Sequence, residues 1–241
     1  YDGTSAHANG ESSADRQYGT SQFNTSWDNN MHVGYMYTSG EAHGTGTSST
    51  IKANVDKLYT DKLSGYASKL DTNAGFCGDR SNLNNQSGVG TGTVITYNKG
   101  YLRVEESAPT LICENASDYY TVASASSGNK KLSYPIGLIT ADEMMLAGHA
   151  GGVFDGSYNH MKTNNGSYLV TGNWFWTMTP AGGYNPFGRA DWIAGVFGVY
   201  GSGNIDDNGA YDTHSLRPVV NLKSDVTITG SGTKTDPYVV S

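Results

Sequence analysis

The sequence predicts an α+β protein with two helices and short, loop-rich antiparallel strands. Charged residues make up only 15% of the 241 positions, against about 25% in ordinary soluble proteins. Gly, Ser, Thr, Asn and Tyr take their place, with 32 Gly and 17 Tyr in the chain. Turn-forming residues and amphipathic rings in such numbers are typical of loop-rich β structure. The aromatic content argues against a disordered chain, and the length allows a sizeable buried core.

The first predicted helix follows Thr50, which can cap it. Apolar residues then recur at i, i+4, i+7 and i+8, which places them on one face of a helix. This face consists of Ile51, Val55, Leu58 and Tyr59. We expect the helix to end near residues 63–65, Leu-Ser-Gly.

The second predicted helix has a stronger start signal. Residues 140–143, Thr-Ala-Asp-Glu, match a capping box, in which the Thr and Glu side chains each satisfy a free backbone N–H. Met144, Met145 and Leu146 are then expected to be buried. Gly148 is expected to supply the left-handed conformation that ends the helix.

Short strand-like stretches account for the remaining ordered chain. Residues 31–37 predict the first strand, and residues 93–97 and 110–113 predict two later ones. Residues 226–229 and 238–240 flank a Gly-Ser-Gly turn and predict a β-hairpin. Six apolar residues of the C-terminal third are assigned to the core: Trp174, Trp176, Val196, Phe197, Val199 and Ile205.

These elements divide the chain into three segments. Residues 1–30 are polar and show no periodicity, which is typical of a loosely held arm or linker. Residues 31–223 form the predicted ligand-binding domain, and residues 224–241 the C-terminal β-hairpin packed on it. The chain opens on Tyr-Asp-Gly without a signal peptide, so we expect a mature or trimmed ectodomain.

Charge and hydropathy exclude two classes of partner. The net charge is −7, and the nearest approach to a basic cluster is Lys130-Lys131. Nucleic-acid binding needs a basic footprint, and an acidic membrane surface repels an acidic chain. No apolar run reaches the roughly 18 residues of a membrane-spanning helix. We therefore expect neither nucleic acid nor membrane insertion.

The two cysteines, Cys77 and Cys113, belong to no metal-binding C-x-x-C pair. In a secreted protein an even count indicates a disulfide, and the alternative is two buried, reduced thiols. A bridge here would stabilise the fold by roughly 3–4 kcal/mol in the chain-entropy model.

Several strings resemble a known group of ectodomains. The start of the second helix, Gly-Leu-Ile-Thr-Ala-Asp-Glu, is similar to that of formylglycine-generating-enzyme-like domains, a branch of the C-type-lectin-like fold. Other strings resemble framing motifs of surface proteins from gut-type Firmicutes, many of them with a pilin-like N-terminal helix. These strings lie at residues 76–81, 109–113, 174–180, 215–222 and 236–240.

The resemblance covers most of the chain and implies a C-type-lectin-like fold at the cell surface or in a pilus. It also implies that the two cysteines are a structural pair, and that ligand is displayed between the framing motifs at residues 174–180 and 215–222. Some relatives are variable proteins that diversity-generating retroelements rewrite at exposed loop positions. This chain lacks the pilin-like helix, and residues 181–195 match none of the framing motifs.

The sequence contains few residue patterns that are typical of catalytic or metal-binding sites. The Glu-Pro-Asn, Gln-Pro-Asp and Trp-Asn-Asp triplets of calcium lectins are absent. Asp206-Asp207-Asn208-Gly209 with Asp212 is rich in oxygen and could hold Ca²⁺, although a turn is the commoner meaning of such a string. The histidines are dispersed, with His160 and His214 single, and no nucleophile elbow is present. We predict no catalytic residue, no metal and no cofactor.

The residues between Pro180 and Arg217 carry the functional prediction. Their composition is that of a paratope, because Tyr, Trp and Arg are frequent hot-spot residues while Gly, Ser and Asn give adaptable polar contacts. The candidate ligand-binding residues are Tyr184, Asn185, Phe187, Arg189, Asp191, Trp192, Tyr200, Asp206, Asp207, Asn208, Tyr211, Asp212 and His214.

Three functions fit the sequence. The leading one is an extracellular adhesin or pilus-associated receptor that uses this loop face to bind a protein or glycan on another cell or surface. The second is a pilin-like filament subunit with pilus subunits as partners. The third is a degenerate enzyme of the formylglycine-generating type, which would show a cleft with a strongly perturbed titratable group.

The loop prediction is tested by truncating its largest ring. An exposed Trp leaves about 150–250 Å² of mostly apolar surface in water, which is a liability unless a partner covers it. Trp192→Ala should weaken binding of a cognate ligand by about 2 kcal/mol or more, with an almost unchanged melting temperature. A large loss of stability without a change in affinity would instead place Trp192 in the core.

Overall fold

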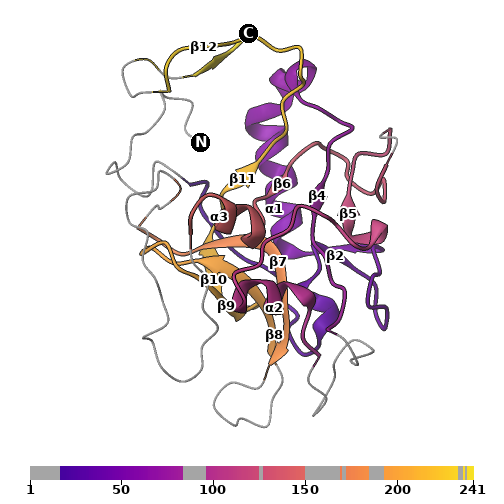
Figure 1. Ribbon diagram of the computed structural model, residues 1–241. Coiled ribbons are helices and arrows are strands. Elements are labelled where there is room, and N and C mark those ends of the chain that lie inside the picture. The colour runs from indigo at the N-terminus through magenta and orange to yellow at the C-terminus, as the bar shows by residue number, and fades with distance from the viewer. Residues whose placement is uncertain are drawn as a thin grey trace.

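The protein is an α+β protein, as the sequence predicts. The computed structural model describes residues 17–83, 96–124, 127–149, 169, 172–184, 193–232, 236 and 238–241. Figure 1 shows a central sheet with helical segments around it. The α-helices of this part are α1 (Thr50–Leu58), α2 (Lys99–Glu105) and α3 (Ala141–Leu146).

The central sheet has five strands in the order β1-β10-β7-β8-β9. Neighbouring strands run antiparallel except β7 and β10, which pair in parallel through Phe175 and Ser215. The register between β7 and β8 shifts on either side of Pro180, so this long hairpin bends there. The strands are β1 (Thr20–Gln22), β7 (Phe175–Tyr184), β8 (Ile193–Val199), β9 (Ile205–Gly209) and β10 (Thr213–Ser215).

Four two-stranded sheets and several short helical turns surround this sheet. The strand pairs are β2 (Met36–Tyr37) with β3 (Thr47–Ser48), β4 (Phe76–Cys77) with β5 (Tyr119–Tyr120), β6 (Gly137–Leu138) with β11 (Pro218–Val219), and β12 (Ile228–Thr229) with β13 (Val239–Val240). The turns are η2 (Asn30–Val33), η3 (Tyr59–Leu63), η4 (Ser64–Lys69) and η5 (Ala116–Asp118). The predicted C-terminal β-hairpin is confirmed, since β12 and β13 pair antiparallel.

The central sheet buries both of its faces. Side chains alternate between the faces of a strand, and two core clusters follow from this. Phe175, Phe197 and Val199 pack with the α2 residue Val104 and the α3 residue Met144. On the other face lie Trp176, Met178 and Val196, together with the apolar side of α1. Five of the six residues assigned to the core from sequence are fully buried, and Trp174 is the exception.

The N-terminal arm is shorter than predicted. Thr20–Gln22 form an edge strand of the central sheet, and Phe23 is completely buried. The indole N–H of Trp176 donates to the Ser21 carbonyl at 2.8 Å, and its ring meets Phe23 edge-on with centroids 5.8 Å apart. Residues 20–30 therefore belong to the domain. A strand of three residues is too short to produce a periodic signal, which explains the error.

The helix predictions hold in their main features. Ile51, Val55 and Leu58 are buried on α1. The helix begins one residue earlier than the predicted cap implies, because Ser49 rather than Thr50 accepts the hydrogen bond from the Lys52 N–H. The chain stays helical beyond α1, through η3 and η4 to Lys69.

The second predicted helix, α3, has the predicted capping box. The Thr140 hydroxyl accepts from the Glu143 N–H at 3.0 Å, and the Glu143 carboxylate accepts from the Thr140 N–H at 2.7 Å. Gly148 ends the helix with φ +90°. Met144 is buried and Met145 partly so, but Leu146 is 56% exposed, contrary to prediction. The helix is only six residues long, and Leu146 lies at its solvent-facing end.

The strand predicted at residues 110–113 is absent, since these residues pair with no strand of the described part. Of the strand predicted at 93–97, residues 93–95 lie outside the described residues, and Tyr97 forms an isolated antiparallel bridge with Gly182. Of residues 31–37, only Met36 and Tyr37 form a strand, while Asn30–Val33 form η2. The helix α2 was not predicted, because its seven residues bury only Gly100 and Val104 and so lack a continuous apolar stripe.

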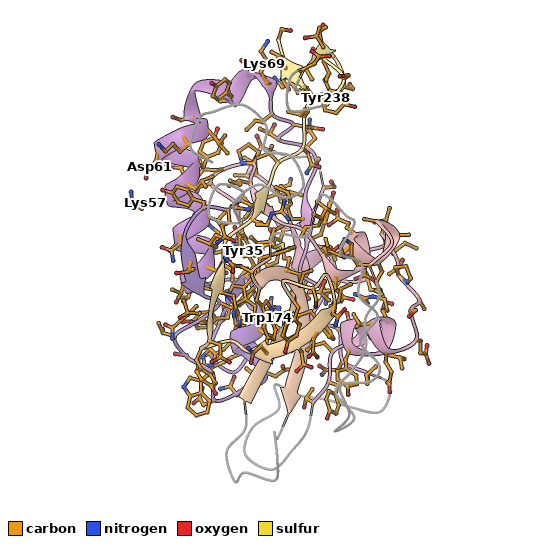
Figure 2. All side chains as sticks on the ribbon, turned by 90° about the vertical axis from the view of Figure 1, so that its left-hand side faces the viewer. Tyr35, Lys57, Asp61, Lys69, Trp174 and Tyr238 are labelled. Atoms are coloured by element: carbon orange, nitrogen blue, oxygen red, sulfur yellow. A yellow bond between two sulfur atoms is a disulfide. The ribbon has the colours of Figure 1, made fainter. Side chains whose placement is uncertain are left out.

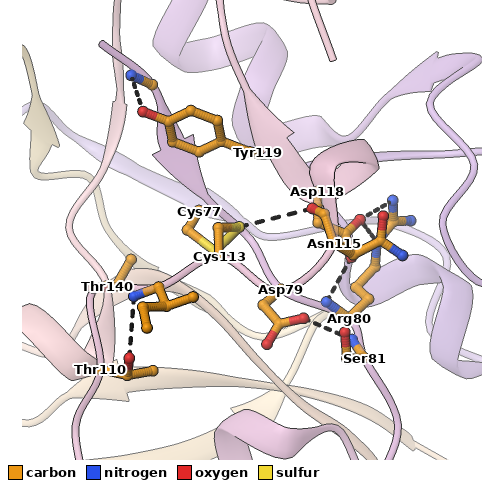
Figure 3. Close-up of a disulfide and its surroundings, with 12 residues drawn as sticks. Cys77, Asp79, Arg80, Ser81, Thr110, Cys113, Asn115, Asp118, Tyr119 and Thr140 are labelled. Atoms are coloured by element: carbon orange, nitrogen blue, oxygen red, sulfur yellow. Dashed lines mark hydrogen bonds and ion pairs between the residues drawn. A yellow bond between two sulfur atoms is a disulfide. The ribbon is translucent and has the colours of Figure 1, made fainter. Parts of the chain in front are cut away.

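A disulfide joins Cys77 to Cys113, which confirms the predicted pairing. Their Cα atoms are 5.6 Å apart and 36 positions separate them in sequence. Figure 3 shows the bridge beside a buried ion pair between Arg80 and Asp118. The bridge therefore ties the exposed segment 110–113 to the strand β4.

No helix in the described ranges is long and apolar enough to cross a membrane.

The core assignment of α1 is tested by a matched pair of leucines. Leu58 is 4% exposed and Leu146 is 56% exposed, both on helices. Leu58→Ala should lower the free energy of unfolding by about 2–5 kcal/mol, the range for a core truncation. Leu146→Ala should change it by less than about 0.5 kcal/mol. Equal effects in urea denaturation would contradict the assignment.

Candidate ligand-binding site

The candidate residues fall into two groups. Asn185, Phe187, Arg189, Asp191 and Trp192 lie outside the described residues, and Tyr184 is described only as the last backbone position of β7. The other seven lie on or beside β9 and β10: Tyr200, Asp206, Asp207, Asn208, Tyr211, Asp212 and His214. Three of these seven, Tyr200, Asn208 and His214, gather around one tryptophan.

Three half-buried rings form the centre of the site. The Trp174 ring lies 3.8 Å from Tyr200 and 4.4 Å from His214, centroid to centroid, and the His214 plane is nearly parallel to it at 11°. All three side chains are half-buried. In Figure 2, Trp174 lies in front of the strands of the central sheet. We call Trp174, Tyr200, Asn208 and His214 the aromatic platform.

A glycine in β8 allows the indole to lie flat on the sheet. A Cβ on Gly198 would stand 1.9 Å from the Trp174 Nε1, which no side chain could tolerate. The same contact buries the indole N–H, which has no hydrogen-bond partner within the described part. The platform therefore depends on the absence of a side chain at Gly198.

The hydrogen bonds of Asn208 determine the protonation state of His214. The Asn208 Oδ1 accepts from the Gly209 N–H at 2.9 Å, so its Nδ2 faces His214 and donates to Nε2 at 2.9 Å. An accepting Nε2 requires a neutral ring with its proton on Nδ1. Burial favours the same form and lowers the pKa of His214 to about 4.

Asp206 supports the platform from β9. Its side chain is 4% exposed. It accepts hydrogen bonds from the Tyr200 side chain and from the Asp207 N–H. Burial raises the pKa of Asp206 to about 6, against the opposing effect of these two hydrogen bonds. The carboxylate thus holds Tyr200 in place.

Asp207 lies on the opposite face of the sheet. Successive side chains of a strand alternate, and the Asp207 charge acts on Tyr97 and Tyr101, which lie with α2. Burial and the neighbouring Asp206 raise the pKa of Asp207 to about 7. Because Asp206 and Asp207 point to different faces, they cannot ligate one Ca²⁺ ion together. Among the described residues no group of three or more His, Cys, Asp or Glu side chains could hold a metal.

Tyr211 and Asp212 lie in the turn between β9 and β10. Tyr211 packs on Trp27, with ring centroids 5.1 Å apart. The Asp212 N–H donates to the Gly209 carbonyl, which closes the turn. Trp27, which belongs to the segment predicted to be an arm, thus packs against the turn between β9 and β10.

Comparisons of the chain with protein-family models, with curated proteins and with solved structures returned no match. The geometry described above is therefore the basis of the functional proposal.

Two ring residues of this surface were not predicted from sequence. Trp174 was assigned to the core, but it is half-buried and stacks with Tyr200 and His214. Its position directly before β7 explains the difference, since the strand that buries Trp176 begins only at Phe175. Trp27 was not predicted to contribute to a site because it lies in a polar segment. A single Trp in such a segment nevertheless indicates a contact with another part of the fold.

The raised pKa of Asp207 predicts a stability effect with a definite sign. The folded state keeps this proton up to about pH 7, whereas a free aspartate side chain has a pKa of 3.8. Folded protein binds more protons between these limits, so Asp207 costs stability as pH rises through them. Asp207→Asn should therefore stabilise the fold by about 1–3 kcal/mol at pH 8, with the gain vanishing near pH 4.

Thermal unfolding of both proteins from pH 4 to pH 8 measures this difference. His214 acts with the opposite sign, since its lowered pKa makes stability rise with pH between about 4 and 6.5. That contribution is present in both proteins and cancels. Asp225→Asn, at an exposed position, controls for the change in net charge. A gain that is the same at every pH would contradict the buried charge.

Proposed function

We propose that this chain is an extracellular, surface-displayed ligand-binding protein on a C-type-lectin-like scaffold. Its ligand contacts the aromatic platform. The single observation that carries this proposal is the convergence of Trp174, Tyr200, Asn208 and His214 from four separate strands or strand ends onto one half-exposed surface. The disulfide is compatible with an extracellular location.

Several features suit the platform to binding. Its rings pack against one another and its polar groups are tied by hydrogen bonds, so little conformational entropy remains to be lost on association. Its histidine is neutral, so a ligand meets uncharged donors and acceptors. Half-buried aromatic rings with a few fixed polar groups are typical of binding sites for small ligands and sugars. A glycan is therefore the first ligand class to test, and a protein the second.

Catalysis has less support at this position. His214 is oriented by an amide rather than by a carboxylate, and the nearest acid, Asp206, is engaged by Tyr200 and a backbone N–H. A general base needs a proton within hydrogen-bond reach and a pKa near the working pH. A pKa near 4 makes His214 a poor base. Binding remains the better proposal.

The test is a glycan and protein array probed with the purified chain, followed by affinity measurements on variants. Tyr200→Leu should weaken binding of an array ligand about tenfold or more, which corresponds to about 1.4 kcal/mol. Tyr66→Leu removes a ring that is 61% exposed on η4 and should leave the affinity unchanged. Ligand binding that is indifferent to Tyr200 would contradict the proposal, as would self-assembly into filaments without ligand binding.

A further inference from the structure

A second hollow lies away from the aromatic platform. It has a volume of about 370 Å³ and lies between the start of α3, the strand pair β6–β11, β4 and the segment 110–113. This volume lies in the range of ligand pockets, about 300–1,000 Å³. None of the four platform residues lines it. We call it the acidic pocket.

Buried charges form one wall of the acidic pocket. Asp79 and Asp142 are 2% and 3% exposed. Arg103 donates from Nε and Nη2 to Asp142, at 2.7 and 3.1 Å, and from Nη1 to Asp79 at 3.1 Å. Glu143, which also lines the hollow, is exposed. The lining thus contains three carboxylates and one guanidinium, and the pocket carries an excess of negative charge.

Aliphatic side chains form the remaining walls and the lip. Leu138, Ile139 and Val219 line the inside. Leu111 and Ile112 stand at the lip and are each 73% exposed. Two adjacent large apolar side chains at such exposure are costly unless a partner covers them.

Two anchors hold the lip in place. The Thr110 N–H donates to Asp142 at 3.1 Å, and Cys113 is tied to Cys77 by the disulfide. Between these two anchors the chain pairs with no strand of the described part. The Ile112 N–H already donates to the Thr110 hydroxyl at 3.1 Å, so a second chain added along this segment would bond to its other backbone groups.

We propose that the acidic pocket binds a lysine side chain of a partner protein, presented on an extended segment that lies along residues 110–113. The aliphatic walls would cover the methylene stem while the ammonium group reaches the carboxylates. The free oxygen of Glu143 and the excess charge of Asp79 and Asp142 would meet that group. Leu111 and Ile112 would pack on side chains that flank the lysine.

The charges that line the acidic pocket favour a lysine side chain over an acidic or an arginine side chain. An acidic side chain would face three carboxylates and is disfavoured despite Arg103. An arginine needs a carboxylate free for bidentate contact, but Asp142 already gives both oxygens to Arg103. A lysine ammonium is a compact charge with three donors and can share acceptors that are in part occupied.

The experiment compares three short peptides that differ only at the central residue. Ac-Val-Thr-Lys-Thr-Val-NH₂ and its norleucine and glutamate counterparts are titrated into ¹⁵N-labelled protein, and backbone resonances are followed. The lysine peptide should shift the resonances of residues 110–113 and 140–143. It should bind about tenfold or more tightly than the norleucine peptide, and more weakly at high salt.

Two variants distinguish the contribution of the carboxylates to peptide binding from that of the apolar side chains at the lip. Glu143→Gln keeps the capping box, because glutamine also serves at that position, and should weaken the lysine peptide about two- to fivefold. Leu111→Ser removes an exposed side chain and should weaken all three peptides alike. Glu106→Gln and Ile228→Ser, both at exposed positions outside the acidic pocket, should change nothing.

The proposal is overturned if norleucine and lysine peptides bind equally, since the carboxylates then contribute nothing. Preference for the glutamate peptide would also overturn it, because Arg103 would then dominate. Resonance shifts confined to the aromatic platform would show that the peptides bind there and not in the acidic pocket. If no peptide bound at millimolar concentration, the acidic pocket would not be a lysine site.

Discussion

The buried ion pair between Arg80 and Asp118 is the interaction on which the rest of the structure depends. Both side chains are at most 1% exposed. Asp118 accepts from the Arg80 backbone N–H at 2.7 Å, from Nε at 2.8 Å and from Nη2 at 2.7 Å, and it also meets the His43 ring at 2.7 Å. Removing one partner of such a pair leaves a buried charge and costs about 3–5 kcal/mol. The pair therefore fixes where its two segments lie.

The elements that position the acidic pocket are attached to this pair. The Arg80 carbonyl accepts from Asn98, the residue before α2, and α2 carries Arg103 to the acidic pocket. In the other direction the Arg80 guanidinium reaches the Gly44 carbonyl in the β2–β3 loop. The disulfide stands next to the pair (Figure 3) and holds the lip of the acidic pocket. The aromatic platform, in contrast, rests on the central sheet, whose edge strand β1 is tied to Trp176.

Elements that depend on neighbours in sequence were predictable, and elements that depend on contacts between distant residues were not. The α1 stripe, the capping box at Thr140 and the terminal hairpin each arise from neighbours in sequence, and all are present. The strand β1 pairs with β10 across almost the whole chain, and α2 is stabilised by packing on β7 and α3 rather than by its own pattern. The candidate list placed Tyr200, Asn208 and His214 together, but composition could not show that Trp174 completes their surface or that Asp207 faces away.

The central claim is that ligand is bound at the aromatic platform, and the most direct measurement is an NMR titration with a ligand found on the array. The indole Nε1–H resonance of Trp174 and the ring resonances of His214 report on the platform alone, since the two rings stack at 4.4 Å. Both should shift on addition of ligand with one common dissociation constant, while the Nε–H resonance of buried Arg80 stays in place. Binding that leaves the Trp174 and His214 resonances unchanged would contradict the claim.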